Sequence, residues 1–153
     1  MTAATADFTD LVQHALKAAK AQAPRAVDDL RRCASQAADA VARVTGGVGT
    51  LELVPINQGE NAKTTYQLQL RKVNSEAPPS DLGVYNATAA GYPIERWYSR
   101  AAWEEHPEQP VKTFGNSFEL EGHFKWLVST PESRLVVLVS FLQQQASETE
   151  RRS

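Results

Sequence analysis

The segment 118–126, FELEGHFKW, places ionisable side chains at alternate positions. If this segment is a β-strand, residues two apart lie on one face, about 7 Å apart at ~3.3 Å per residue. Glu119, Glu121 and His123 would then share a face, and two carboxylates with an imidazole can bind a metal ion or divide acid and base roles. Lys125 continues that face with a charge that repels a cation. We therefore favour a solvated sheet surface here and keep an enzyme site as an alternative.

A second set of residues combines aromatic rings with arginines between residues 92 and 103. Tyr, Trp and Arg often anchor binding surfaces because they join a large rigid apolar area to polar ends. They also fill cores, so core packing is the competing interpretation. Strand alternation in 92–100 mixes apolar and charged residues on both faces, which predicts that at least one ring is exposed. The candidate partner- or ligand-binding residues are Tyr92, Arg96, Trp97, Tyr98, Arg100 and Trp103.

Common catalytic and cofactor motifs are missing from the sequence. There is no glycine-rich phosphate loop, nucleophile elbow, paired-histidine metal helix or EF-hand loop. Cys33 is the only cysteine, which excludes an intrachain disulfide and a multi-cysteine metal site. We interpret Cys33 as a small packed residue of a helix. No cofactor, metal site or catalytic residue is therefore predicted, an enzyme is the less favoured class, and no motif identifies a family.

The bulk properties of the chain limit its partners. Its 153 residues suit one domain, and 42% hydrophobic residues are enough for one core. The net charge is −2 and the basic residues are spread along the chain, which argues against a nucleic-acid partner. No apolar run is long enough for a membrane span. The first residues lack the features of a secretory signal, so we expect a cytoplasmic protein without membrane contact.

Residues 8–45 are rich in alanine and predict helix. Phe8, Leu11, Val12, Ala15 and Ala19 form one apolar stripe at helical spacing. Pro24 lacks the amide hydrogen that an interior helical position needs, which predicts either a kink or two successive helices. Gly46 and Gly47 supply the stop, and we expect the helical segment to be stabilised by packing on a sheet. Beyond the proline, the second stripe is Val27, Leu30, Ala34, Ala37, Val41 and Val44.

The rest of the chain is predicted to be mainly strands. Short strands are expected at 50–55 and 65–73, separated by a polar loop at 57–63, and a hairpin is expected around Ala90 and Gly91. The prolines and acidic residues of 101–115 predict a loop that includes one helical turn. Residues 118–128 and the segment LVVLVSFL at 135–142 are interpreted as strands, the latter apolar on both faces. A helix beginning near Thr130 is the alternative for the latter.

The predicted fold is α+β, with the N-terminal helical segment packed on an antiparallel sheet of about five or six strands. Residues 1–146 form a single domain, and 147–153 form a disordered polar tail. The leading functional hypothesis is a non-catalytic protein-binding or assembly module that self-associates through the sheet, because a strand apolar on both faces needs a second cover. The alternatives are a small-ligand-binding α+β cup with a pocket between helix and sheet, and an enzyme that uses Glu119, Glu121 and His123.

Overall fold

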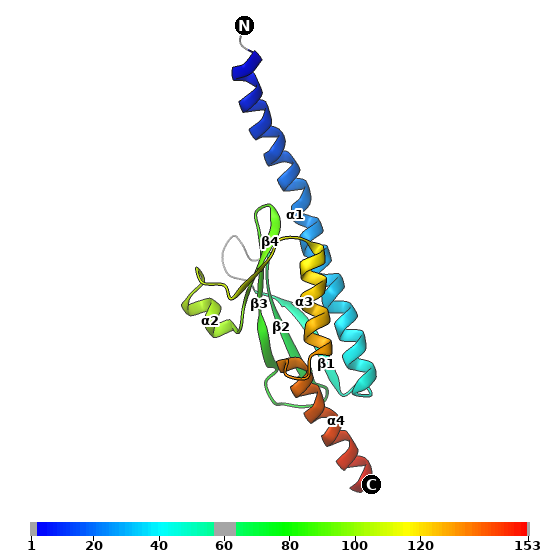
Figure 1. Ribbon diagram of the computed structural model, residues 1–153. Coiled ribbons are helices and arrows are strands. Elements are labelled where there is room, and N and C mark those ends of the chain that lie inside the picture. Colours follow the sequence, from blue (N-terminus) through cyan, green and yellow to red (C-terminus); the bar gives the residue numbers. More distant parts are fainter. Residues whose placement is uncertain (1–2, 57–63, 153) are drawn as a thin grey trace.

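The computed structural model describes the backbone of residues 3–56 and 64–152, and the side chains of residues 7–56 and 64–145. One long helix lies across one face of a five-stranded antiparallel sheet, so the predicted α+β class is confirmed (Figure 1). The expected loop at 57–63 lies outside the described residues. No described helix combines the length and the apolar character needed to cross a membrane.

The strands follow one another across the sheet in chain order. They are β1 (Gly49–Pro55), β2 (Thr65–Lys72), β3 (Ser80–Thr88), β4 (Gly91–Trp97) and β5 (Lys112–Phe114), and each pairs antiparallel with the next. Tyr66, Leu68 and Leu70 alternate along β2 and are buried, as the period of two predicts. The predicted hairpin joins β3 to β4. A short helix, α2 (Arg100–Glu105), precedes β5.

Helix α1 (Ala3–Val44) is a single helix that continues through Pro24, so of the two alternatives the two-helix one is wrong. Its C-terminal half packs on the sheet through Leu30, Ala34, Ala37 and Val41, as the second stripe predicts. Val44, at the end of that stripe, is exposed instead. Cys33 is buried in the same core, as expected for a small packed residue, and burial raises the pKa of its thiol. Small side chains here let the helix approach the strands closely.

Residues 117–129 form a helix, α3 (Ser117–Ser129), so the interpretation of 118–128 as a strand is wrong. Asn116 caps the helix by accepting a hydrogen bond from the Glu119 amide at 2.9 Å, and the Glu119 carboxylate accepts one from the Gly115 amide. The first of these bonds satisfies an amide that the first helical turn leaves without a partner, and the second fixes the chain just before the cap. The buried side chains follow a helical spacing: Leu120, His123, Phe124 and Leu127.

The apolar segment at 135–142 belongs to helix α4 (Arg134–Arg152), so the strand interpretation is wrong and the helical alternative is right. The helix begins at Arg134 rather than near Thr130, and the Ser133 hydroxyl accepts from the Val136 amide at 3.2 Å. The expected disordered tail is helical as far as Arg152. Adding residues to an existing helix is easier than starting one, which explains why a polar segment continues it.

Candidate functional site

The proposed catalytic face of Glu119, Glu121 and His123 does not exist, because these residues lie on a helix. Glu119 caps the start of α3, Glu121 pairs with Arg32 of α1 at 2.7 Å, and His123 is buried. A helix turns each successive residue by about 100°, so positions two apart diverge instead of sharing a face. Within the described residues, no group of three or more His, Cys, Asp or Glu side chains is placed to hold a metal ion.

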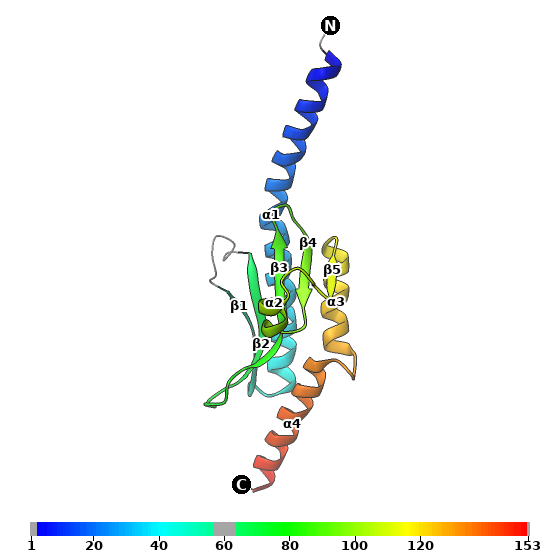
Figure 2. The ribbon, with the colours of Figure 1, turned by 90° about the vertical axis from the view of Figure 1, so that its left-hand side faces the viewer.

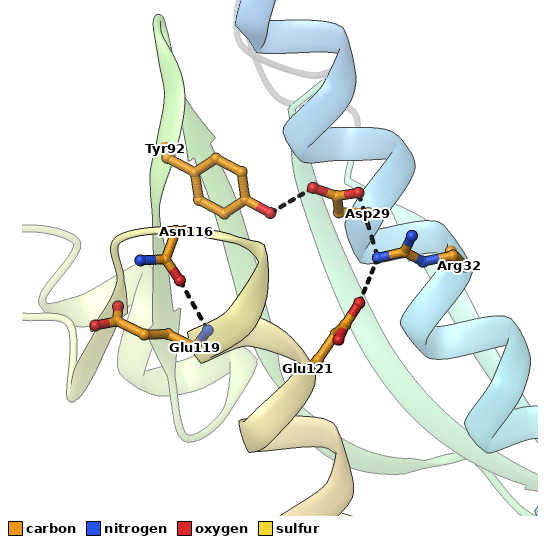
Figure 3. A network of polar contacts seen from close by, with 6 residues as sticks. All are labelled: Asp29, Arg32, Tyr92, Asn116, Glu119 and Glu121. Carbon is orange, nitrogen blue, oxygen red and sulfur yellow. Dashed lines mark hydrogen bonds and ion pairs between the residues drawn. The ribbon is translucent and has the colours of Figure 1, made fainter.

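Glu121 belongs to a polar network that joins α1, β4 and α3 (Figure 3). The Tyr92 hydroxyl donates to Asp29 at 2.7 Å, and Arg32 lies between Asp29 and Glu121, 3.4 Å from the first carboxylate and 2.7 Å from the second. Partial burial and the Asp29 carboxylate raise the pKa of Tyr92. Every charged member of this network has a partner of opposite charge, so the network fastens three elements and offers no unpaired group for chemistry.

The structure divides the six predicted binding residues among different places. Tyr92 belongs to the polar network, while Trp97 is buried and donates its indole N–H to the His106 carbonyl at 3.1 Å. Trp103, on α2, packs against a small second core that contains Trp97. Arg100 pairs with Glu104, one helical turn away. Tyr92, Trp97 and Trp103 contact neighbouring elements, and Arg100 is exposed in a surface ion pair on α2. Arg96 and Tyr98 are the two candidates that line one hollow together.

Arg96 and Tyr98 line a hollow of about 480 Å³ between the β4–β5 edge of the sheet and α3. We call it the edge hollow. Lys112 of β5 and Trp126 of α3 also line it, as does one edge of His123. Trp126 is half exposed and stacks on the His123 ring, with centroids 6.3 Å apart and planes 19° apart. The edge hollow therefore combines two cations with an accessible aromatic surface.

A buried hydrogen-bonded chain holds Arg96 in place beneath the edge hollow. The Arg96 Nε–H donates to the Tyr85 hydroxyl at 3.1 Å, and Arg96 Nη2 donates to the Leu82 carbonyl at 3.1 Å. The Tyr85 oxygen lies 2.6 Å from His123 Nε2. Since the hydroxyl accepts from Arg96, its own proton is available to Nε2, which places the proton of the neutral imidazole on Nδ1. Arg96 is thereby held between two tyrosine rings, 5.8 Å from that of Tyr85 and 5.6 Å from that of Tyr98.

Burial favours the uncharged forms of both titratable members of this chain, Tyr85 and His123. It raises the pKa of Tyr85 to about 12, against the opposing effect of Arg96. It also lowers the pKa of His123 to about 3, and the positive charges of Arg96 and Lys112 act in the same direction. His123 is therefore an uncharged donor and acceptor at neutral pH, and it cannot act as a general base near pH 7 because it holds a second proton too weakly.

A second candidate site lies on the N-terminal half of α1, which extends beyond the sheet in both views (Figures 1 and 2). The β3–β4 turn meets the helix near Ala23, where a Cβ on Gly91 would come within 2.8 Å of the Ala23 Cα. We call residues 3–22 the arm. Four large apolar side chains of the arm are exposed: Phe8 by 74%, Leu11 by 62%, Val12 by 58% and Leu16 by 57%.

The apolar stripe of the arm was expected from its spacing, whereas its exposure was not. The sequence predicts that Phe8, Leu11 and Val12 belong to a buried face, and the structure leaves that face without any cover among the described residues. An apolar stripe on a projecting helix is a candidate interaction surface, because water contact with several large side chains is unfavourable.

Comparison of the chain with protein-family models, with curated proteins and with solved structures finds no match. Function must therefore be inferred from the two surfaces themselves. The arm presents an apolar helical stripe and can bind another helix. The edge hollow presents cations and rings, and can bind a small ligand.

Proposed function

We propose that the protein is a non-catalytic assembly module in which the arms of two copies bind each other side by side. The exposed stripe of Phe8, Leu11, Val12 and Leu16 is the single observation that carries this proposal. A helix apolar on one side gains stability by burying that side against a second helix. A second copy of the chain supplies an identical stripe, and a two-fold pair is the commonest form of soluble oligomer.

The sizes of the side chains favour an antiparallel pair. The large residues Phe8, Leu11 and Val12 lie toward the N-terminal end of the arm, whereas the small residues Ala15, Ala18 and Ala19 lie toward its other end. A parallel pair would place Phe8 against Phe8 and alanine against alanine, which leaves gaps between the helices. An antiparallel pair brings Phe8 level with Ala19, and Val12 level with Ala15. Large packs on small at these two levels, as close packing favours, while Leu11 is level with Leu16 and two large side chains meet there.

The charges of the arm favour the same direction. Asp7 and Asp10 lie near its N-terminal end, and Lys17 and Lys20 lie near its other end. In the antiparallel pair Asp7 is level with Lys20, and Asp10 is level with Lys17. A parallel pair would bring like charges together. Asp7 and Lys20 lie on the two different edges of the stripe, and Asp10 and Lys17 lie on the opposite side of the helix, so these charges favour the orientation through long-range attraction and supply little affinity.

The affinity of such a pair is modest. Complete burial of a large apolar side chain contributes about 1.5–3 kcal/mol. Since the four side chains are 57–74% exposed, each contributes about 1–1.5 kcal/mol, and the eight of a pair contribute roughly 8–12 kcal/mol. Association costs an estimated 4–15 kcal/mol. With the association cost at the low end of this range, we expect a reversible dimer with a dissociation constant of about 1–200 μM.

The arm replaces the sheet as the surface proposed for self-association. The sequence favours the sheet because it predicts a strand apolar on both faces, but that segment is part of α4. The outer surface of β1 and β2 is polar: Glu52 accepts from Gln69 at 3.2 Å and from Arg71 at 2.6 Å. A surface of paired polar groups gains little from burial.

Sedimentation equilibrium between 1 and 200 μM tests the proposal. Phe8→Glu places a charge in the stripe, and Phe118→Glu makes the same change at the exposed start of α3. We expect wild type and Phe118→Glu to dimerise alike, and Phe8→Glu to remain a monomer. A wild-type monomer throughout the range would overturn self-association. Equal loss of dimer in both variants would show that the arm is not the interface.

The predicted cytoplasmic location and the absence of nucleic-acid and membrane partners accompany this proposal. A net charge of −2 without a basic cluster in the sequence supports the expected absence of a nucleic-acid partner. If wild-type protein binds neutral phospholipid vesicles and Phe8→Glu does not, the expected absence of a membrane partner is contradicted. The stripe would then be assigned to a membrane surface instead.

A further inference from the structure

The edge hollow contains an unusual arrangement of two cations. Arg96 and Lys112 are directly opposite each other in the β4–β5 pairing. Directly opposed residues of antiparallel strands project to the same side, and like charges in that position destabilise a sheet. Both side chains line the edge hollow. Some compensating interaction is therefore expected in front of them.

The surrounding protein does not neutralise these two charges. Among the described residues, neither Arg96 nor Lys112 forms an ion pair with a carboxylate. Arg96 donates to a neutral hydroxyl and to a carbonyl, and the Lys112 amine lies over the Phe114 ring at 5.8 Å. The Glu119 carboxylate lines the edge hollow too and accepts from the Gly115 amide, so it offsets one of the two positive charges at a distance without an ion pair to either cation among the described residues. An anion from outside can supply the missing charge.

The fixed position of Arg96 gives the edge hollow a prepared binding geometry. Its guanidinium is held by Tyr85 and Leu82 before any ligand arrives, so little side-chain entropy remains to be lost on binding. The neutral His123 ring lies beside it and does not add a competing charge. Guanidinium and ammonium groups together suit a carboxylate, which accepts hydrogen bonds at both oxygens.

Aromatic rings line the edge hollow both on α3 and beside Arg96. Trp126 is 49% exposed and is backed by the parallel His123 ring, and Tyr98 is exposed beside Arg96. A flat ring stacks on such a surface with a preference for offset or tilted geometry. The volume of about 480 Å³ falls within the range of about 300–1,000 Å³ for small-molecule pockets.

We propose that the edge hollow binds a small aromatic carboxylate, with the carboxylate between Arg96 and Lys112 and the ring against Trp126. This site is independent of the arm, so its success or failure does not depend on self-association. It is a development of the ligand-binding alternative, with the pocket on the edge of the sheet instead of enclosed beneath the helix.

Titration calorimetry with 1-naphthoate tests the proposal, with 1-naphthylmethanol as the neutral ring and cyclohexanecarboxylate as the anion without an aromatic face. We expect measurable binding of naphthoate, and binding at least tenfold weaker for each comparison compound. In nitrogen-resolved NMR, the indole N–H of Trp126 should shift on addition of naphthoate. The buried indole of Trp97, which is bonded to the His106 carbonyl, should not shift.

Two variants test separately the contribution of the Lys112 charge and that of the free volume in the edge hollow. Lys112→Gln removes one cation, and we expect about tenfold weaker binding, as for loss of a charge-assisted hydrogen bond. Gly122→Leu fills the edge hollow, because a Cβ at Gly122 meets no atom within 4 Å, and it should abolish binding. Lys125→Gln, at an exposed lysine of α3 that does not line the edge hollow, is the matched control and should leave binding unchanged.

Three results would overturn the proposal. Naphthoate that binds no more tightly than naphthylmethanol would show that the cations contribute nothing. Inorganic phosphate that binds as tightly as naphthoate would show that the ring contributes nothing. Full binding by Gly122→Leu would place the ligand elsewhere.

Discussion

The Tyr85 hydroxyl oxygen lies 2.6 Å from Nε2 of His123, in the buried contact between β3 and α3. The sequence pattern makes His123 a candidate catalytic or metal-binding group on an exposed face, whereas in the structure it is a neutral member of the core. Phe114 and Phe124 pack against its ring, with centroids 4.7 Å and 5.4 Å away. The hydrogen bond satisfies one ring nitrogen within an otherwise aromatic environment.

The burial of His123 predicts acid sensitivity. An unfolded chain protonates this histidine below its ordinary pKa of 6.5, whereas the folded protein resists protonation until about pH 3. Folding stability must therefore fall as the pH drops from 6.5 toward 3, by about 1.4 kcal/mol per pH unit. At pH 4.5 the loss from this group is about 2–3 kcal/mol. His123→Gln keeps an acceptor for Tyr85 and removes the titration.

Urea denaturation of both proteins at pH 7.5 and 4.5 measures this effect. We expect wild type to lose about 2–3 kcal/mol more than His123→Gln between these two values. Carboxylates titrate in the same range, but they are common to both proteins and cancel in the comparison. Parallel losses in the two proteins would show that His123 is accessible to protons in the folded state.

Two glycines predict opposite effects of the same substitution. Gly91 has φ +92°, and a Cβ there would come within 2.8 Å of the Ala23 Cα and 2.9 Å of the Gln22 carbonyl oxygen. Gly91→Ala must strain the β3–β4 turn or move it from α1, so we expect a loss of about 2–3 kcal/mol. Gly122 lies inside α3 with open space around it, and Gly122→Ala should stabilise the protein by about 0.5–1 kcal/mol. Thermal unfolding monitored by circular dichroism measures both, and equal effects would contradict the described turn.

The charges of the arm predict that one pair of substitutions weakens the dimer and that a second pair restores it. Asp7→Lys with Asp10→Lys gives an arm with basic groups at both ends, so we expect dimer dissociation to become about tenfold easier at low ionic strength. Adding Lys17→Asp and Lys20→Asp reverses the whole pattern and should restore the dimer. Sedimentation equilibrium at 20 mM and 500 mM salt measures this, and the difference should shrink at high salt. Failure of the fourfold variant to recover would contradict the antiparallel orientation.

The misassignment of 118–126 has a physical reason in the sequence itself. Phe118, Leu120, Phe124 and Trp126 alternate like a strand, while Leu120, Phe124 and Leu127 repeat like a helix. Both periods fit such a short segment. The deciding signal was local: Asn116 followed by Glu119 is an N-terminal capping pair, and it is used as such in the structure. The LVVLVSFL segment was ambiguous for a related reason, because continuous apolar residues carry no period at all.

The exposed arm follows from lengths that the sequence already contained. A helix of 42 residues is about 63 Å long at ~1.5 Å per residue. A strand of nine residues, the longest here, spans about 30 Å. Such a sheet covers less than half of the helix. Periodicity identified the apolar face of the arm, but periodicity cannot state what covers that face. The edge hollow was less predictable, because packing brings together Arg96, Lys112 and Trp126 from separate elements.

The distance between two labelled arms tests the assembly most directly. A nitroxide attached through Gln22→Cys, in a Cys33→Ala background, reports the separation between the two copies by pulsed electron paramagnetic resonance. In the proposed antiparallel register, the two labelled positions are separated by 17 residues along the helix axis, or about 25 Å. With helices about 8–10 Å apart, the expected backbone distance is about 27 Å. A distance near 10 Å would indicate a parallel pair, and the absence of any intermolecular distance at 200 μM would contradict self-association through the arm.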